Sequence, residues 1–182
     1  MNLYRRIIEE IGDYEGPAVC DRGRTTTYPD LFRRTDLAAE RMRRIGIVPG
    51  ANVAILADDS LEYIILSLAV LSLDAAIVPV SSRATEEEKE SLLREMRINF
   101  LFCTEPYRKQ NDAVFPGTDC LYDRCYVRRL DPKIEPVPLP GGRTAAFIRF
   151  SSGTTGKNKG VATSARSCAR MTISMCWLPS TR

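Results

Sequence analysis

The sequence contains no histidine among its 182 residues. This absence excludes a Ser-His-Asp triad, a Cys-His pair, and any zinc or haem site that needs a histidine ligand. Any chemistry must therefore rest on lysine, carboxylates, hydroxyls, thiols or backbone amides.

An excess of charge of one sign is also missing. The chain has 26 Lys and Arg against 23 Asp and Glu, a formal charge of +3, which is too small to indicate a nucleic acid or an anionic membrane. One alternative is a nucleic-acid surface made of two clusters rich in arginine and tyrosine. Asp36 and Glu40 interleave with the first cluster, which favours the solvated face of a helix, and we expect no nucleic-acid partner. The two clusters are Arg33, Arg34, Arg41, Arg43 and Arg44, and Tyr122, Arg124, Tyr126, Arg128 and Arg129.

Long apolar runs and paired cysteines are lacking too. The most apolar stretch, residues 61–80, is interrupted by Glu62 and Asp74 and falls short of the about 18 clean residues of a membrane span. The first residues have a basic pair followed by acids, unlike a secretory signal. The six cysteines form no C-x-x-C pair, so we interpret most of them as small buried residues in a reducing compartment. We expect a soluble, cytoplasmic protein without a membrane span.

The length and the 44% hydrophobic content are those of one globular domain, or slightly more. Strand-like and helix-like segments alternate along the chain, which predicts an α/β fold with a mainly parallel sheet and packed helices. Residues 104–130 are less regular, and the proline-rich residues 131–142 predict an irregular connection. Helices are expected near 1–10, 28–45, 61–73 and 85–96, a hairpin over 18–28, and strands over 53–57, 76–80, 100–103 and 144–150.

Two helix starts carry capping signals. Thr27 is followed by Pro29 and Asp30, and Thr85 is followed three residues later by Glu88. Glu86, Glu87 and Glu88 also offer a metal-binding alternative, but consecutive helix positions point in different directions, so we assign these acids to the helix start and expect no metal ligands.

The segment with the clearest chemistry follows the last predicted strand. Residues 151–161 contain three glycines, four hydroxyl side chains and two lysines. Glycines allow tight turns that expose backbone amides, while hydroxyls and lysines contact phosphate oxygens. The segment is not a Walker loop, because Asn158 follows Lys157, and Thr155 breaks the G-x-G-x-x-G pattern. It predicts a polyphosphate-binding loop, with a plain surface loop as the alternative.

The run from Phe150 to Val161 resembles the phosphate-loop signature of the adenylate-forming enzymes, which include acyl-CoA synthetases, luciferases and adenylation domains of nonribosomal peptide synthetases. Each position fits except Asn158, where the family usually has proline. Residues 27–31, 48–55 and 71–80 are similar to three further family segments in the same order, with Asp74 in place of a glycine. The resemblance covers about residues 20–161 and implies an incomplete N-terminal subdomain of the adenylate-forming fold.

The resemblance implies an ATP-dependent reaction in two steps. A carboxylate attacks the α-phosphorus of ATP, and a thiol of coenzyme A or of a carrier protein then takes the acyl group. ATP and Mg²⁺ are the implied cofactors, and no catalytic or metal-binding residue is carried over to this chain. Lys157 falls at a variable family position, so Lys159 is the assigned lysine. The residues that would hold the β- and γ-phosphates are Ser152, Gly153, Thr154, Thr155, Gly156 and Lys159.

After Val161 the resemblance stops. Residues 162–182 contain no acid, three arginines and two cysteines. We therefore expect a partial AMP-binding domain over residues 1–161 and an atypical tail over 162–182, frameshifted or disordered, with a divergent natural tail as the alternative. The family's adenine, magnesium and carboxylate motifs lie further along, so the chain by itself is expected to be inactive in adenylation. A non-catalytic nucleotide- or anion-binding α/β module is the alternative function.

Overall fold

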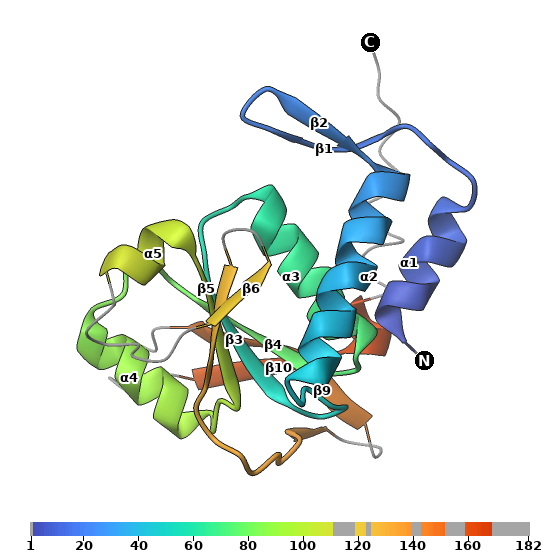
Figure 1. Ribbon diagram of the computed structural model, residues 1–182. Helices are drawn as coiled ribbons and strands as arrows, with labels where there is room; N and C mark the ends of the chain where they lie inside the picture. The colour runs from blue at the N-terminus through green and yellow to red at the C-terminus, as the bar shows by residue number, and fades with distance from the viewer. Residues whose placement is uncertain (1, 111–118, 123–124, 140–142, 152–158, 169–182) are drawn as a thin grey trace.

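The computed structural model describes residues 2–110, 119–122, 125–139, 143–151 and 159–168. Helices and strands alternate through the first 110 residues, as the sequence predicts, and strands dominate the remainder (Figure 1). The elements are α1 Leu3–Ile11, β1 Pro17–Asp21, β2 Arg24–Thr27, α2 Tyr28–Arg44, β3 Asn52–Leu56, α3 Leu61–Ser72, β4 Ala76–Val80, α4 Glu86–Glu95, β5 Phe100–Thr104, α5 Glu105–Gln110, β6 Asp119–Tyr122, β7 Cys125–Arg129, β8 Pro138–Leu139, β9 Arg143–Ser151 and β10 Lys159–Ser164.

The main sheet has the strand order β10-β9-β4-β3-β5-β7-β6, with β8 also paired to β9. The four central strands β9, β4, β3 and β5 are parallel to one another. Antiparallel pairs complete the sheet on both sides, β10 on β9 and β7 on β5. The predicted α/β class with a mainly parallel centre is confirmed, while the antiparallel margins were not predicted.

Helices cover both faces of the sheet. Helices α1, α2 and α3 lie on one side, and α4 and α5 lie on the other (Figure 1). Strand β3 shows why its sequence is apolar throughout: Ile55 packs in the core beneath α2 and α3, while Leu56 packs in the core beneath α4, and both are fully buried. A strand covered on both faces needs apolar residues at every position rather than at alternate ones.

Local signals set the helix ends. The Thr27 side chain accepts a hydrogen bond from the Asp30 backbone N–H at the start of α2, and Gly46, with φ of +96°, follows the end of that helix. The predicted capping box of α4 is confirmed, because Thr85 and Glu88 each accept a bond from the other's backbone N–H, at 3.2 Å for Glu88 N and 2.8 Å for Thr85 N. In the part of the chain described here, we find no helix with the length and apolar character of a membrane span.

The region 104–130, predicted to be less regular, contains α5, β6 and β7. Strand β7 pairs with β5 over five residues, and its first three residues are buried. This pairing is antiparallel. Polar and apolar residues do not alternate along β7, so the periodicity of its sequence gives only a weak signal for a strand.

Candidate phosphate-binding site

The predicted loop lies between the two strands of a hairpin. Strand β9 ends at Ser151 and β10 begins at Lys159, and these two residues are paired in the antiparallel register. The next pairs, Phe150 with Gly160 and Arg149 with Val161, continue the hairpin away from the loop. The sequence between them therefore leaves and re-enters the sheet at one point.

The described residues include one of the six predicted site residues. Lys159 is the first residue of β10, and its backbone is described. The other five, Ser152, Gly153, Thr154, Thr155 and Gly156, lie outside the described residues. Their roles stay predictions.

The hairpin base lies at the carboxyl edge of the parallel strands. Phe147 of β9 pairs in parallel with Ile77 of β4, so both strands run towards the same edge, together with β3 and β5. In open α/β sheets this edge is where ligands bind, because the loops that follow the strands surround a crevice there.

A cavity of about 340 Å³ opens at this edge. Its lining combines apolar residues with an acid, two residues that carry hydroxyls and an arginine, which suits a small polar ligand. The lining residues are Ala57, Asp59, Tyr63, Pro79, Val80, Ser81 and Arg149.

Arg149 also lines the cavity, and it was not among the residues predicted for the site. It is exposed, lines the cavity, and stands two positions before Ser151, so it places a positive charge near the start of the loop. Its guanidinium carbon lies 5.9 Å from the centroid of the Phe147 ring. A charged residue within the otherwise apolar run 145–150 was the available signal.

Tyr63 is another residue that lines the cavity. Burial is the main cause that raises the pKa of Tyr63 above its ordinary value, and the nearby positive charge of Arg149 partly opposes this shift. The phenol therefore stays protonated at neutral pH and keeps a proton that it can donate.

Polar contacts brace the other loops of this edge. The Ser82 hydroxyl donates to Asp58 Oδ1 at 3.2 Å. Burial and a hydrogen bond to Asp58 raise the pKa of Tyr107, so the phenol remains a donor to that carboxylate. These contacts join the loops after β3 and β4 to α5.

A protein-held metal site finds no support among the described residues. They contain no group of three or more His, Cys, Asp or Glu side chains placed to hold an ion. Glu86 is paired with Lys89 at 2.8 Å, and Glu88 closes the capping box. The assignment of these acids to the start of α4 is confirmed.

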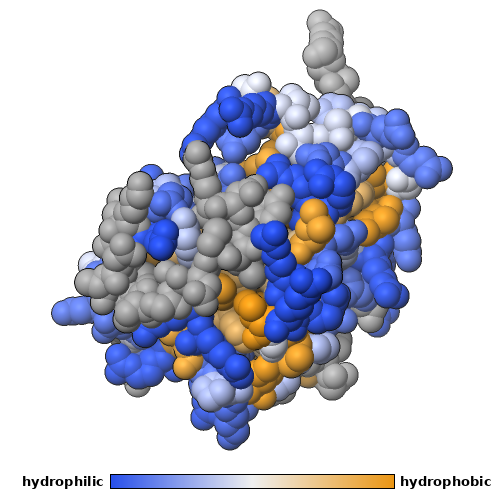
Figure 2. Space-filling model, in the orientation of Figure 1, coloured by the Kyte–Doolittle hydropathy of each residue, from blue (hydrophilic) through white to orange (hydrophobic). Residues whose placement is uncertain are grey.

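The two clusters weighed as a nucleic-acid surface have other roles where they are described. Arg33 pairs with Asp30 and Arg44 with Glu40 along α2, whose surface is mainly hydrophilic (Figure 2). Tyr126 is 7% exposed, and the guanidinium carbon of Arg108 lies 4.1 Å from its ring centroid, so its ring is not free to stack on a base.

The profile of the AMP-binding enzyme family matches residues 12–181. The chain belongs to this family. The predicted resemblance to adenylate-forming enzymes is thereby confirmed. The match runs across residue 162, as does β10, so the proposed boundary of the tail stays a prediction.

Relatives within the family include large peptide synthetases. Cyclosporin synthetase simA of Tolypocladium inflatum is 30% identical over 157 residues, which cover 85% of this chain and 1% of that protein. Across the curated relatives compared, this chain spans between 1% and 12% of their length.

Solved structures show the same fold. The o-succinylbenzoate CoA synthetase of Bacillus subtilis, in complex with an acyl-adenylate intermediate, has a TM-score of 0.74 and 18% identity, covering 100% of this chain and 47% of its own. ATP-bound MatB of Rhodopseudomonas palustris has a TM-score of 0.73 and 19% identity, covering 96% of this chain and 37% of its own. The chain thus has the fold of the N-terminal part of adenylate-forming enzymes.

Proposed function

We propose that this chain is the part of an ATP-dependent carboxylate-activating enzyme that holds the polyphosphate of ATP. In the whole enzyme, a carboxylate would attack the α-phosphorus and release pyrophosphate, and a thiol of coenzyme A or of a carrier protein would then take the acyl group. The compartment expected for this activity is the cytoplasm.

The observation that carries this proposal is the pairing of Ser151 with Lys159 at the carboxyl edge of the sheet. The pairing brings both ends of the glycine- and hydroxyl-rich segment to one point, at the edge where α/β folds bind phosphates. Belonging to the AMP-binding family supports the same assignment.

The donor set suits a polyphosphate. Backbone amides around Gly153 and Gly156 would donate to phosphate oxygens, and the hydroxyls of Ser152, Thr154 and Thr155 would add further bonds. Lys159 would contribute a charge-assisted contact to the β- and γ-phosphates. These groups position the nucleotide and neutralise its charge, and they move no proton.

Mg²⁺ would bind together with ATP, through phosphate oxygens. Any protein ligand to the ion would come from outside the described residues, which provide no group of acids placed to hold it. When bound, it would neutralise part of the phosphate charge. Arg149 lies where it can add to that neutralisation from the protein side.

The test is a competition measurement on the full chain. Titration calorimetry with MgATP is expected to show saturable binding, and inorganic tripolyphosphate is expected to displace ATP while adenosine does not. This order follows if the contacts are to phosphate and not to the base. Carboxylate-dependent exchange of labelled pyrophosphate into ATP, measured in parallel, is expected to be undetectable for this chain alone.

Two results would overturn the proposal. If MgATP does not bind to the chain, the proposed role in holding its polyphosphate is wrong. Displacement of ATP by adenosine as effectively as by tripolyphosphate would place the binding energy on the base and away from the loop.

A further inference from the structure

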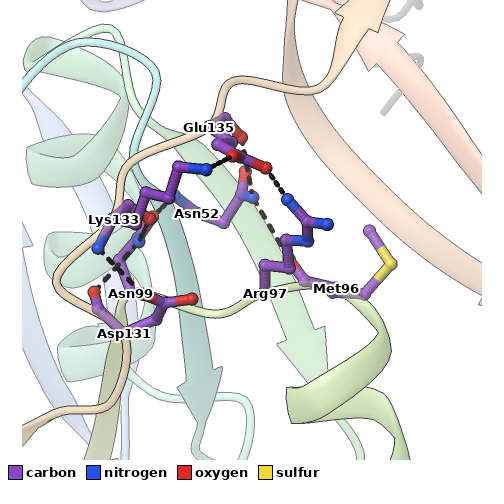
Figure 3. Close-up of polar contacts among 7 residues, drawn as sticks. All are labelled: Asn52, Met96, Arg97, Asn99, Asp131, Lys133 and Glu135. Carbon is purple, nitrogen blue, oxygen red and sulfur yellow. Dashed lines mark hydrogen bonds and ion pairs between the residues drawn. The ribbon is translucent and has the colours of Figure 1, made fainter.

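Two buried asparagines fasten the segment that leads into β8 and β9. Residues 131–137, here called the strap, run along the amino end of the central strands (Figure 3). Asn99 Nδ2 donates to the carbonyl oxygens of Asp131 at 3.1 Å and Lys133 at 2.7 Å. Asn52 Nδ2 donates to the carbonyl oxygen of Glu135 at 3.4 Å. Asn52 is 1% exposed and Asn99 is 0% exposed, so the donor side of these bonds is shielded from water.

The two asparagines are also bonded to each other. Asn52 N donates to Asn99 Oδ1 at 2.8 Å, and Asn99 N donates to the carbonyl oxygen of Asn52 at 2.9 Å. Asn52 begins β3, and Asn99 directly precedes β5. The asparagines that bind the strap are therefore anchored to β3 and β5, in the middle of the parallel sheet.

The strap is bound much as a strand would be. In an extended chain, alternate carbonyls point to the same side, and the bonded carbonyls belong to residues 131, 133 and 135. Side-chain amides take the place of a neighbouring strand's N–H groups. Pro132 and Pro136, at the alternating positions, have no N–H, which leaves the outer side short of donors for another strand.

Ion pairs reinforce the same segment. Glu135 pairs with Arg97, which follows α4, and with Lys133 at 2.5 Å (Figure 3). The Asp131 carboxylate accepts a bond from the Lys133 backbone N–H at 2.8 Å. The strap is thus held by the side chains of Asn52, Asn99 and Arg97 and by polar contacts between its own residues.

The strap leads to β9 by way of β8. The Ala145 N–H donates to the Val137 carbonyl at 3.2 Å, and β8 pairs with the first residues of β9. Strand β9 is held laterally by β4, through the pair of Ile77 with Phe147, and by β10. The strap adds a further constraint at the start of β9, and the loop begins where β9 ends.

We infer that Asn99 and Asn52 are positioning residues for the base of the β9–β10 hairpin, where Ser151 pairs with Lys159, acting from the opposite edge of the sheet through the strap and β9. This inference rests on the proposed function for its binding readout. Loss of the amide donors would leave the strap less firmly bound, so that β9 would shift or fray at its start. Ser151 and Lys159, at the hairpin base, would then occupy several positions instead of one.

The test compares three asparagine variants of the full chain. Asn99→Ala removes two strap bonds and Asn52→Ala removes one, while Asn2→Ala is the matched control. Asn2 Nδ2 bonds Ser72 O at 3.1 Å and Asp74 Oδ1 at 3.0 Å, which ties α1 to the end of α3. MgATP dissociation constants are measured by calorimetry at a temperature where circular dichroism shows each variant folded, and amide exchange is followed in β9.

We expect the ATP dissociation constant to rise about five-fold in Asn99→Ala, by a smaller factor in Asn52→Ala, and by less than about two-fold in Asn2→Ala. The amides of β9 should exchange faster in the first two variants. Equal changes in Asn99→Ala and Asn2→Ala would overturn the inference, because a general loss of stability would then explain both.

The failures can be told apart. If the wild-type chain binds no ATP, the proposed function is wrong. If amide exchange in β9 is unchanged in the Asn99→Ala protein, the inference is wrong whatever the outcome for ATP. If Asn99→Ala does not fold, Asn52→Ala, which breaks one strap bond, decides the question with the same two readouts.

Discussion

Ser151 and Lys159 are paired across the base of the β9–β10 hairpin. Their Cα atoms are therefore about 5 Å apart, as in any antiparallel pair. The loop between them is already closed by the sheet, so a ligand has no closure entropy to supply. The sheet therefore holds the two ends of the proposed phosphate-binding loop together before a ligand binds.

Arg149 is expected to contribute charge to the same element. Its side chain is exposed at the rim of the carboxyl-edge cavity, where a positive charge attracts polyphosphate but is screened by salt. Arg149→Gln should weaken MgATP binding about three-fold at low ionic strength, with the effect fading as salt is added. Arg22→Gln, on the β1–β2 turn, is the control of equal charge change. A salt-independent effect would contradict this role.

Tyr4 links stability to alkaline pH. Its buried hydroxyl donates to Asp36 Oδ1 at 2.9 Å, and burial together with this carboxylate raises the pKa of Tyr4 well above its ordinary value. The folded state holds this proton more tightly than the unfolded state. Its stabilisation is therefore complete below the ordinary pKa of about 10 and is lost as the pH rises towards the raised folded value.

Tyr4→Phe should lower the free energy of unfolding by about 1 kcal/mol at pH 7 and flatten its decline above about pH 10. Urea unfolding between pH 7 and pH 11 measures both effects. Tyr14→Phe, at a position that is 55% exposed, is the control. The same slope above pH 10 in wild type and Tyr4→Phe would show that Tyr4 is not the titrating group.

The capping box of α4 gives a third expectation. Thr85→Ala removes the oxygen that accepts from Glu88 N and should cost about 1 kcal/mol, whereas Thr85→Ser keeps the oxygen and should cost little. Thermal unfolding of the three proteins decides the matter. If the serine variant is as unstable as the alanine variant, the hydroxyl is not the stabilising group.

Gly50 approaches the strap closely. It has φ of +85°, and a Cβ there would lie 2.6 Å from Pro136 Cγ, whereas Gly46, with φ of +96°, has nothing within 4 Å. Gly46→Ala should therefore show backbone strain alone, about 1 kcal/mol, and Gly50→Ala about 2–3 kcal/mol because steric overlap is added.

The difference should shrink when Pro136→Ala is combined with Gly50→Ala, as measured by urea unfolding. Equal losses in the two single glycine variants would mean that Gly50 and the strap are not in contact.

The predictable part of the fold depends on local signals. The helices begin where Thr27 and Thr85 supply oxygens to backbone donors, and the central strands coincide with the short apolar runs. The parallel direction of β3, β4 and β5 follows from the helices that connect them, α3 and α4. These features depend on residues close together in sequence.

The rest depends on contacts between distant residues. Asn99 donates to carbonyls 32 and 34 residues away, and Asn52 donates to one 83 residues away. From the sequence alone, these asparagines cannot be distinguished from ordinary turn residues. Strand β7 becomes a strand because β5 offers it a partner. Of the candidate site, the motif and Lys159 could be predicted, whereas the cavity and the place of Arg149 on its rim required the fold.

The most direct test of the central claim is the affinity for MgATP of wild type, Lys159→Ala and Lys157→Ala, measured by titration calorimetry. We expect saturable binding by wild type and a dissociation constant raised about ten-fold in Lys159→Ala, because a charged contact to phosphate is lost. In Lys157→Ala we expect a change below about two-fold. No binding by wild type, or equal losses in the two lysine variants, would contradict this claim.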